Sequence, residues 1–329
     1  MAPVKIGMAS FAHMHAGSYA SSLRSLPGAV IECIWDADEQ RGKQMAEQFG
    51  SRYVADLDEF LATGISGVVI CSENAGHRDL AVRAARAGKH ILCEKPIATT
   101  VEDAREMIDA AAAAGVHLAT AFPCRFSPAM WQLRERVRAG ELGQILAIAG
   151  TNRGTMPGGW FIELDKSGGG AVIDHTVHVV DLMRWLTGAE VRQVYAEISN
   201  KMYGLDFDDC GTLTMEFDNG MFATLDTSWS RPKSYPTWGD VTMEVVGTEG
   251  TASLDMFNQK IIGYNDALMR ATYHPWGSNI DTGLVSAFLE TCRGNFPERL
   301  ATGYDGLKAL EVALAAYESA RSGRTIALA

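Results

Sequence analysis

The sequence predicts an α/β protein whose first half folds as a Rossmann-type, doubly wound parallel sheet. Short apolar runs alternate there with helical patterns, and most of these runs are continuously apolar. Such strands are typical of a parallel sheet that helices cover on both faces. From residue 146 onward, strand-like runs follow one another and closing helices come last. We therefore expect two domains, over residues 1–122 and 123–329, and the second should be an α+β domain.

The first domain is expected to contain strands over residues 4–9, 30–35, 67–71, 90–93 and 117–121. The helical patterns between them cover residues 16–26, 40–49, 59–62, 78–87 and 101–114. The patterns at 40–49, 78–87 and 101–114 each stop at a glycine. Helices commonly end in this way, because glycine accepts the left-handed conformation that follows the last turn.

The second domain is expected to contain a sheet with one apolar face. Its strand-like runs cover residues 146–151, 191–198, 210–217, 221–229, 240–246 and 251–255, with helices over 168–186, 280–293 and 306–321. Residues 218–220, Asp-Asn-Gly, favour a hairpin turn between two of the runs. Leu213, Met215 and Phe217 alternate with polar residues. Their face needs cover from a helix or a second subunit, and we expect a homodimer or homotetramer.

The composition is that of a globular protein that does not bind nucleic acid. Hydrophobic residues make up 47% and charged residues 21% of the chain, and the net charge of −11 opposes binding to a polyanion. The six cysteines lack metal-binding spacing, which is typical of reduced thiols in the cytoplasm. No stretch reaches the roughly 18 apolar residues of a membrane span. We therefore expect a cytoplasmic protein that does not enter membranes.

Polar residues at the carboxyl ends of the predicted strands indicate a ligand site, since doubly wound sheets bind ligands there. In the first turn, Ser10, Ala12 and His15 stand at the glycine positions of the Gly-x-Gly-x-x-Gly fingerprint. Serine and alanine still let a pyrophosphate approach the backbone, whereas histidine is larger. Asp36 follows the second strand, where a carboxylate can bind an adenosine ribose and would repel a 2′-phosphate. The expected cofactor is therefore NAD rather than NADP.

Two further stretches carry side chains suited to moving protons. Glu94-Lys95-Pro96 follows the fourth strand, and the proline favours an extended Lys95. Three glycines at 168–170 open a helical pattern in which Asp174 and His178 are four residues apart and share a face. A carboxylate can orient such an imidazole for proton transfer. Each stretch taken alone also fits an ordinary surface loop or helix pair.

Together, these two motifs resemble those of the glucose–fructose oxidoreductase/inositol dehydrogenase/MocA family. The resemblance covers nearly the whole chain, through Asn74, His77 and residues 88–90, 125–128, 247–250 and 305–306. It implies a Rossmann domain followed by a domain with a large, open, mostly antiparallel sheet. It also implies hydride transfer between NAD or NADP and a hydroxyl-bearing carbon of a sugar, cyclitol or related polyol. The first turn departs from the family pattern, as does Glu73, where many members have proline.

The resemblance makes Lys95, Asp174 and His178 the expected catalytic residues. His178 would exchange the hydroxyl proton, Asp174 would hold its imidazole, and Lys95 would stabilise charge on the reacting oxygen. The expected cofactor-binding residues are Ser10, Phe11, Ala12, His13, Met14, Asp36, Ser72, Asn74, His77, Glu94, Lys95 and Arg125.

Aromatic side chains with polar neighbours suit the apolar faces and hydroxyls of a sugar ring. The expected substrate-binding residues are Lys95, Trp160, Asp174, His175, His178, Tyr235 and His274. Arg231, Trp238 and Trp276 lie in similar stretches between the predicted strands.

Other functions remain open on the same fold. One is a redox-assisted lyase or glycosidase, which keeps NAD tightly bound and releases no net NADH. Another is a non-catalytic NAD-binding regulator, against which Lys95, Asp174 and His178 argue. A metal site built from Asp174, His175, His178 and His274 is disfavoured, since no histidine pair has the i,i+4 spacing of a helical zinc site. We expect no metal.

Overall fold

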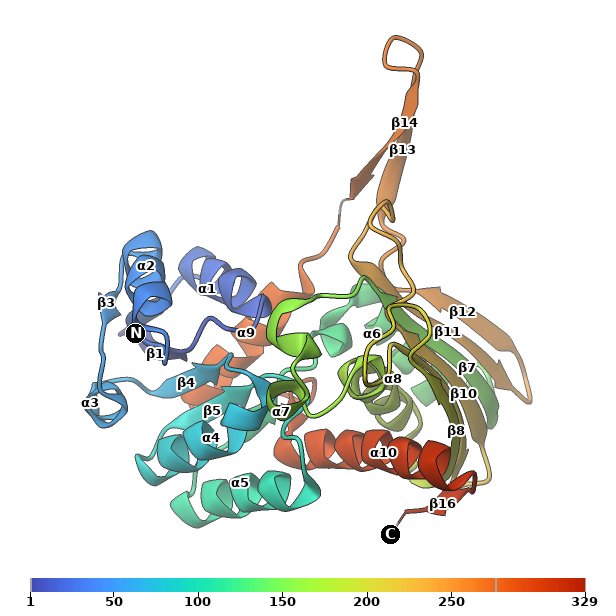
Figure 1. Cartoon of the computed structure of the whole chain (residues 1–329), viewed down its shortest axis with the longest axis horizontal. Helices are drawn as coiled ribbons and strands as arrows, with labels where there is room; N and C mark the ends of the chain where they lie inside the picture. Colours follow the sequence, from blue (N-terminus) through green and yellow to red (C-terminus); the bar gives the residue numbers. More distant parts are fainter. Residues whose placement is uncertain (1, 276, 329) are drawn as a thin grey trace. The chain divides into compact units, whose positions relative to one another are not determined.

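The computed structural model describes residues 2–275 and 277–328, which form two seven-stranded sheets and a two-stranded hairpin. Trp276, one of the aromatic residues considered above, lies outside the described residues. The chain divides into two compact units (Figure 1). Unit 1 comprises residues 1–126, 159–168 and 280–311, and unit 2 comprises residues 127–158, 169–279 and 312–329.

Unit 1 is built on a parallel sheet with the strand order β15-β6-β5-β4-β1-β2-β3. The strands are β1 (Val4–Ala9), β2 (Ala29–Trp35), β3 (Arg52–Tyr53), β4 (Gly67–Ile70), β5 (His90–Cys93), β6 (Leu118–Thr120) and β15 (Ala301–Thr302). All neighbours pair in parallel except β15 with β6. This confirms the predicted Rossmann-type sheet. Because the strand order reverses between β1 and β4, ligands are expected at the loops that follow these two strands.

Helices cover both faces of this sheet, as the continuously apolar strands predict (Figure 1). On one face α1 (His15–Ser25) packs with α9 (Ile280–Cys292), and on the other α4 (His77–Arg86) packs with α5 (Val101–Ala114). The unit also contains α2 (Glu39–Phe49), α3 (Leu57–Ala62), α7 (Leu164–Ser167) and the short helices η1 (Asn74–Gly76), η2 (Pro123–Phe126) and η3 (Gly159–Ile162). The core between the sheet, α1 and α9 contains Ile6, Met8, Tyr19, Leu23 and Phe288.

Local sequence explains where several of these helices begin and end. The side chains of Asp38, Asp56 and Thr100 accept backbone hydrogen bonds at the starts of α2, α3 and α5. Gly50 and Gly115 end α2 and α5 in the left-handed conformation, as the sequence predicts.

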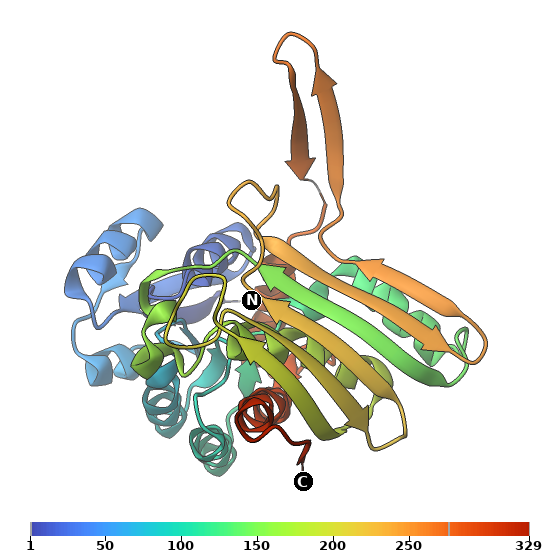
Figure 2. The same cartoon turned by 45° about the vertical axis from the view of Figure 1, so that its right-hand side comes forward.

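Unit 2 is built on a mostly antiparallel sheet with the strand order β12-β11-β7-β10-β9-β8-β16 (Figure 2). The strands are β7 (Ile145–Gly154), β8 (Val191–Ser199), β9 (Cys210–Phe217), β10 (Phe222–Ser228), β11 (Gly239–Gly247), β12 (Thr251–Asp255) and β16 (Ile326–Ala327). β7 and β10 pair in parallel, whereas the other neighbours are antiparallel. The hairpin predicted at 218–220 joins β9 to β10, and Gly220 has a positive φ of 83°.

Helix α8 (Ala171–Thr187) covers one face of this sheet. Gly150 of β7 and Gly211 of β9 allow the close approach, because a Cβ at either glycine would meet α8 side chains within 3 Å. Leu213, Met215 and Phe217 are buried. Of the two kinds of cover that the sequence allows, a helix of the same chain is the one that packs on the apolar sheet face. The homodimer or homotetramer stays a prediction. Unit 2 also contains α6 (Pro128–Arg138) and the later turns of α10 (Gly303–Ser322).

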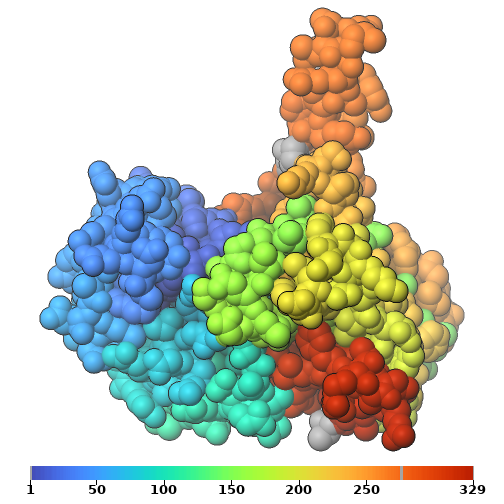
Figure 3. All heavy atoms as spheres, viewed as in Figure 1, coloured from blue at the N-terminus to red at the C-terminus, as the bar shows by residue number. Residues whose placement is uncertain are grey.

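A hairpin that the sequence did not predict follows β12 in unit 2. β13 (Lys260–Asn265) pairs with β14 (Arg270–Pro275) and with no other strand of the described chain. Figure 3 shows it as the orange arm that stands clear of the sheet residues, and Tyr264 and Met269 are 83% and 86% exposed. Among the described residues, no helix has the length and apolar character needed to cross a membrane.

Candidate active site

The turn after β1 reproduces one feature of a glycine-rich nucleotide-binding turn without the glycine. Ser10 has a φ of 74°, in the left-handed region that glycine adopts freely and other residues rarely adopt. Its backbone N–H donates to Trp35 O at 2.7 Å, and its Oγ accepts from Ala12 N at 3.1 Å. The chain then enters α1 at His15, so the N–H groups at the start of this helix follow the end of β1. This is the arrangement that receives a pyrophosphate in Rossmann folds.

Asp36 is buried and lies at the end of β2, in contact with the first turn. Its Oδ2 accepts from Phe11 N at 2.7 Å and its Oδ1 accepts from Asp38 N at 2.9 Å. Arg41 donates to both carboxylate oxygens, from Nε at 2.8 Å and from Nη2 at 2.6 Å. A carboxylate with these partners fixes the turn against α2. Its contact with a ribose stays a prediction.

The loop after β4 contains Ser72, Asn74 and His77. Both His77 nitrogens lie near carbonyl oxygens, those of Pro96 at 3.0 Å and Ser72 at 3.3 Å, and burial lowers the pKa of its imidazole. Asn74 donates to Ser167 O at 2.8 Å. Its Oδ1 is buried and accepts no hydrogen bond from the described residues. NAD carries ribose hydroxyls and a carboxamide N–H, which are donors that this oxygen could accept from, so the loop fits the cofactor.

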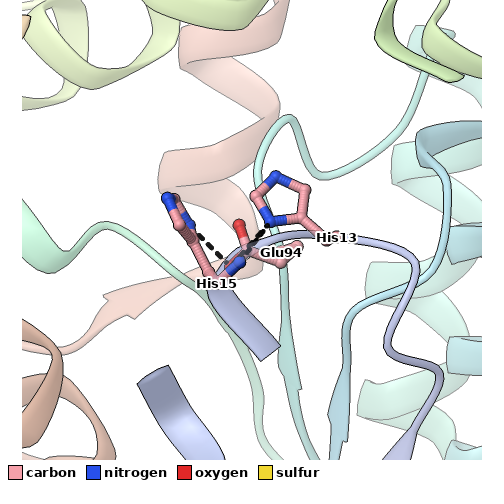
Figure 4. A group of neighbouring side chains, drawn as sticks. All are labelled: His13, His15 and Glu94. Carbon is pink, nitrogen blue, oxygen red and sulfur yellow. Dashed lines mark hydrogen bonds and ion pairs between the residues drawn. The ribbon is translucent and has the colours of Figure 1, made fainter. Parts of the chain in front are cut away.

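Glu94 lies at the centre of a cluster with His13 and His15 that sequence reasoning did not find (Figure 4). His15 Nδ1 lies 3.0 Å and His13 Nδ1 lies 3.7 Å from Glu94 Oε1, while Lys95 N donates to Glu94 Oε2 at 3.0 Å. Burial favours the neutral acid, but His13, His15 and Lys95 outweigh it and hold the pKa of Glu94 well below its usual value. Burial likewise disfavours a charged His15, yet Glu94 raises its pKa. The signal in the sequence was the His-x-His spacing.

Trp160 and Arg125 also belong to unit 1. The Trp160 indole N–H donates to Ala12 O at 3.0 Å, and its ring stacks on Phe161 with centroids 3.9 Å apart. The structure thus places Trp160 against the first turn rather than in the later aromatic stretches of unit 2. Arg125 lies 3.4 Å from Asp305 and is buried.

The glycine triplet opens α8 in unit 2, and its N-terminus is capped from within the chain. Gly170 N donates to Asp208 Oδ1 at 3.0 Å, and Val172 N donates to Asp208 Oδ2 at 2.7 Å. The Tyr317 hydroxyl accepts from Gly170 N at 3.2 Å. A Cβ on Gly170 would lie 1.9 Å from Asp208 O. The close approach that the glycines permit is therefore made by this chain's own Asp208.

Asp174 and His178 lie one turn apart on α8, and both are buried. Asp174 Oδ2 accepts from Trp229 Nε1 at 3.1 Å and lies 3.2 Å from His175 Nε2. His175 Nδ1 lies 3.1 Å from Ser228 O, at the end of β10. Trp229 and His175 thus fix the position of the Asp174 carboxylate. Neither the Trp229–Asp174 contact nor the His175–Ser228 contact was predicted, since both join α8 to the end of β10.

The remaining predicted substrate residues, Tyr235 and His274, have contacts of their own within unit 2. Tyr235 lies under the Arg231 guanidinium, 4.1 Å from the ring centroid, and Arg231 pairs with Asp240. His274 lies on the exposed hairpin with its Nε2 3.0 Å from Thr272 Oγ1. The group of described side chains that could hold a metal ion is the His13 cluster. Asp174, His175, His178 and His274 are not members of that group.

Two family models match this chain, one for each part. The model described as the oxidoreductase family with an NAD-binding Rossmann fold matches residues 4–122, and that of the GFO/IDH/MocA C-terminal domain matches residues 130–253. The chain belongs to the GFO/IDH/MocA oxidoreductase family. It is an oxidoreductase with an NAD-binding Rossmann domain, as the motifs around Lys95 and Asp174 predicted.

Individual relatives within this family cover almost the full chain. The scyllo-inositol 2-dehydrogenase (NAD(+)) of Bacillus subtilis strain 168 is 29% identical, over 98% of this chain and 95% of that protein. The 1,5-anhydro-D-fructose reductase of Ensifer adhaerens is 28% identical, over 92% of each chain. Among solved structures, GenD2 from gentamicin A biosynthesis, in complex with NAD, has a TM-score of 0.90 and 26% identity, over 100% of this chain and 97% of that chain.

Proposed function

We propose that this protein is an NAD-dependent dehydrogenase or reductase acting on a hydroxyl-bearing carbon of a sugar, cyclitol or related polyol. The observation that supports it most is the carboxylate of Asp174, whose position Trp229 and His175 fix. Asp174 lies on the same helix as His178, in a chain with an NAD-binding Rossmann unit. The names of the relatives agree, because inositol is a cyclitol and anhydrofructose is a sugar.

Bound NAD would supply the hydride acceptor or donor, and the chain would manage the proton and the charge. The turn at Ser10, the loop at Asn74 and the start of α1 would hold the dinucleotide. His178 would take the proton of the substrate hydroxyl in oxidation and return it in reduction. Asp174 would stabilise the protonated imidazole, and Lys95 would donate a hydrogen bond to the reacting oxygen.

The substitution His178→Asn tests this assignment. It should keep NAD binding and the fold but lower turnover by roughly 10²–10⁴-fold, because positioned proton transfer is lost. The measurement is NADH absorbance during a screen of sugars and cyclitols, with kcat and KM compared for the substrates that react. His117→Asn is the matched control, since His117 stacks on His90 at the amino ends of β5 and β6, whereas the first turn follows the carboxyl end of β1.

Normal turnover in His178→Asn would contradict the assignment. Substrate consumption without net NADH would instead support a redox-assisted lyase or glycosidase. Tight NAD binding with no reaction across the screen would support a regulator. These three outcomes separate the proposal from the two other functions that the fold allows.

The cofactor preference tests the proposed role of Asp36. The wild-type protein should bind NAD more tightly than NADP in titrations of tryptophan fluorescence, because a buried carboxylate repels a 2′-phosphate. Asp36→Ser should reduce the difference between the affinities for NAD and NADP, because it leaves Arg41 without its anionic partner. Asp38→Asn is the control, since asparagine can keep the helix cap that Asp38 makes at α2. Tighter binding of NADP by the wild type would contradict the prediction.

We also propose that the protein acts in the cytoplasm as a homo-oligomer. The six cysteines are all free thiols, and Cys33, Cys71, Cys93 and Cys124 are buried, which suits a reducing compartment. Support for the oligomer comes from Phe222 and Val246, which are exposed apolar side chains of unit 2.

A further inference from the structure

We propose that His13, His15 and Glu94 form a binding site for one divalent transition-metal ion of the zinc class. The three side chains come from the turn after β1, the first residue of α1 and the residue after β5 (Figure 4). One ligand atom from each lies within 4.8 Å of the other two. The family's cofactor motifs do not require this arrangement, because His15 stands where the fingerprint has a glycine.

The geometry gathers two imidazoles around one carboxylate oxygen. His15 Nδ1 and His13 Nδ1 lie 3.0 Å and 3.7 Å from Glu94 Oε1. The side chains of Glu94 and His13 are 0% and 1% exposed, and that of His15 is 26% exposed. Two of the ligands are therefore fixed by the core, while His15 gives the cluster a route to solvent. An ion bound at His13 Nδ1 would replace the hydrogen bond that this nitrogen accepts from His15 N at 3.2 Å.

Charge favours a cation at this position. Glu94 is buried, and a buried carboxylate is unfavourable unless a cation or hydrogen bonds compensate it. A divalent ion between the two rings would add to the compensation that His15 and the Lys95 N–H give. The backbone N–H of Lys95 bonds the other carboxylate oxygen, which is the kind of outer contact that orients a metal-binding carboxylate.

The donor set defines the class of ion. Two imidazole nitrogens and one carboxylate oxygen suit Zn²⁺ and its neighbours in the first transition row rather than Mg²⁺ or Ca²⁺, which prefer oxygen ligands. Three protein ligands leave a fourth position for water or another oxygen ligand. The thiols of Cys71 and Cys93 are buried, and neither belongs to the group of described side chains that could hold a metal ion.

Other histidines of unit 1 lack this combination. His77 directs one nitrogen toward Pro96 O and the other toward Ser72 O. His90 and His117 repeat the local geometry of the cluster, since His90 Nδ1 accepts from His117 N at 3.1 Å, as His13 Nδ1 accepts from His15 N at 3.2 Å. That surface pair is not part of the group of described residues that could hold a metal. The His90–His117 pair therefore provides a matched control for the metal-binding test.

The test measures metal binding directly and does not depend on turnover. The whole chain of 329 residues, stripped with a chelator and dialysed, is titrated with Co²⁺ and then with Zn²⁺ in competition. The proposal expects one ion per chain, visible Co²⁺ bands of a nitrogen and oxygen site, and no thiolate-to-cobalt charge-transfer band. It also expects Zn²⁺ to raise the thermal unfolding midpoint.

Substitutions then locate the ion. His15→Ala and Glu94→Gln should each weaken Co²⁺ binding by at least about tenfold, since even outer-shell changes at metal sites cost that much. His117→Asn should bind as the wild type does. His15→Ala is suited to the test because alanine is a good helix former and His15 is the first residue of α1. Circular dichroism checks that each variant folds.

Three results would overturn the proposal. One is wild-type Co²⁺ affinity in both His15→Ala and Glu94→Gln. Another is a thiolate charge-transfer band, which would assign the ion to a cysteine. The third is weak binding of several ions with no effect on the unfolding midpoint, which would show adventitious ions only. In each case His15 and Glu94 would be a hydrogen-bonded pair that holds no ion, and the proposed oxidoreductase function would still stand.

Discussion

At the scale of single residues, Ser10 takes the place of the first glycine of the nucleotide-binding fingerprint. Its φ of 74° is the conformation for which the fingerprint uses glycine, and its hydroxyl accepts the Ala12 N–H. A side chain in the left-handed region costs roughly 1–2 kcal/mol. The hydroxyl offsets part of that cost by satisfying a backbone donor within the turn. Serine therefore substitutes for glycine through its own hydrogen bond.

Two substitutions at Ser10 separate these effects. Ser10→Gly removes the strain together with the hydroxyl, whereas Ser10→Ala keeps the strain and loses the hydroxyl. We therefore expect the free energy of unfolding of Ser10→Ala to fall below that of Ser10→Gly by about 1–2 kcal/mol. Urea unfolding of both variants and the wild type measures the difference. If Ser10→Ala matched Ser10→Gly, the backbone conformation at Ser10 would carry no strain.

The sequence predicted a site residue only where its position follows from the residues next to it in the chain. Asp36 and the Asp174–His178 spacing could be placed because each follows a strand or a turn of a recognisable pattern. The partners of these side chains could not be placed. Trp229 reaches Asp174 from 55 residues away, and Glu94 lies 79 residues from His15. Such contacts depend on which strands become neighbours, and the spacing of residues along the chain does not show this.

At the scale of elements, the predicted runs agree with the observed strands and helices to within a few residues over most of the chain. Those that were missed are short or weakly patterned: β3, β15 and β16 contain two residues each. Helix α6 begins at Pro128 after the Ser127 cap, a signal that the sequence contains. The β13–β14 hairpin lacks a buried face, so neither of its strands shows the alternation on which strand prediction depends.

Within the antiparallel sheet, Asp240 links β11 to β7. It accepts from Arg153 Nε at 3.0 Å and from Thr151 Oγ1 at 2.9 Å, and it pairs with Arg231. Burial would raise its pKa, but these donors, Arg231 first among them, lower it below the usual 3.8. A carboxyl group whose pKa is lowered by folding stabilises the fold above its unfolded value and loses this contribution as the pH falls through its folded value.

Asp240→Asn should therefore lower the free energy of unfolding by about 2–3 kcal/mol at neutral pH, because hydrogen bonds to a charged group are lost. The difference from the wild type should shrink as the pH falls below 3.8. Urea unfolding across a pH series measures both. Asp226→Asn is the control, since Asp226 is 42% exposed and lies 3.8 Å from Arg153, and it should cost less than about 1 kcal/mol. A difference that stays constant down to the lowest pH would contradict the assigned pKa direction.

At the scale of the whole molecule, the open face of the antiparallel sheet is the surface that favours self-association. Because α8 packs on the face of Leu213, Met215 and Phe217, an interface with a second subunit would use the opposite face. Phe222 and Val246 both pair with Ala147, so they lie in one row across β10, β7 and β11. They are 56% and 42% exposed. Large apolar side chains in a row on an exposed sheet are typical of an interface.

We therefore expect a homodimer or homotetramer that depends on this row. Sedimentation of the wild type at micromolar concentration should give a mass above that of one 35.6 kDa chain. The double variant Phe222→Glu with Val246→Glu should shift it to the monomer, because identical charged rows would face each other across a symmetric interface. Leu164→Glu is the control: Leu164 is 53% exposed on α7 in unit 1 and should leave the mass unchanged. A monomeric wild type would contradict the oligomer. An unchanged oligomer in the double variant would move the interface elsewhere, with the exposed β13–β14 hairpin as the next surface to substitute.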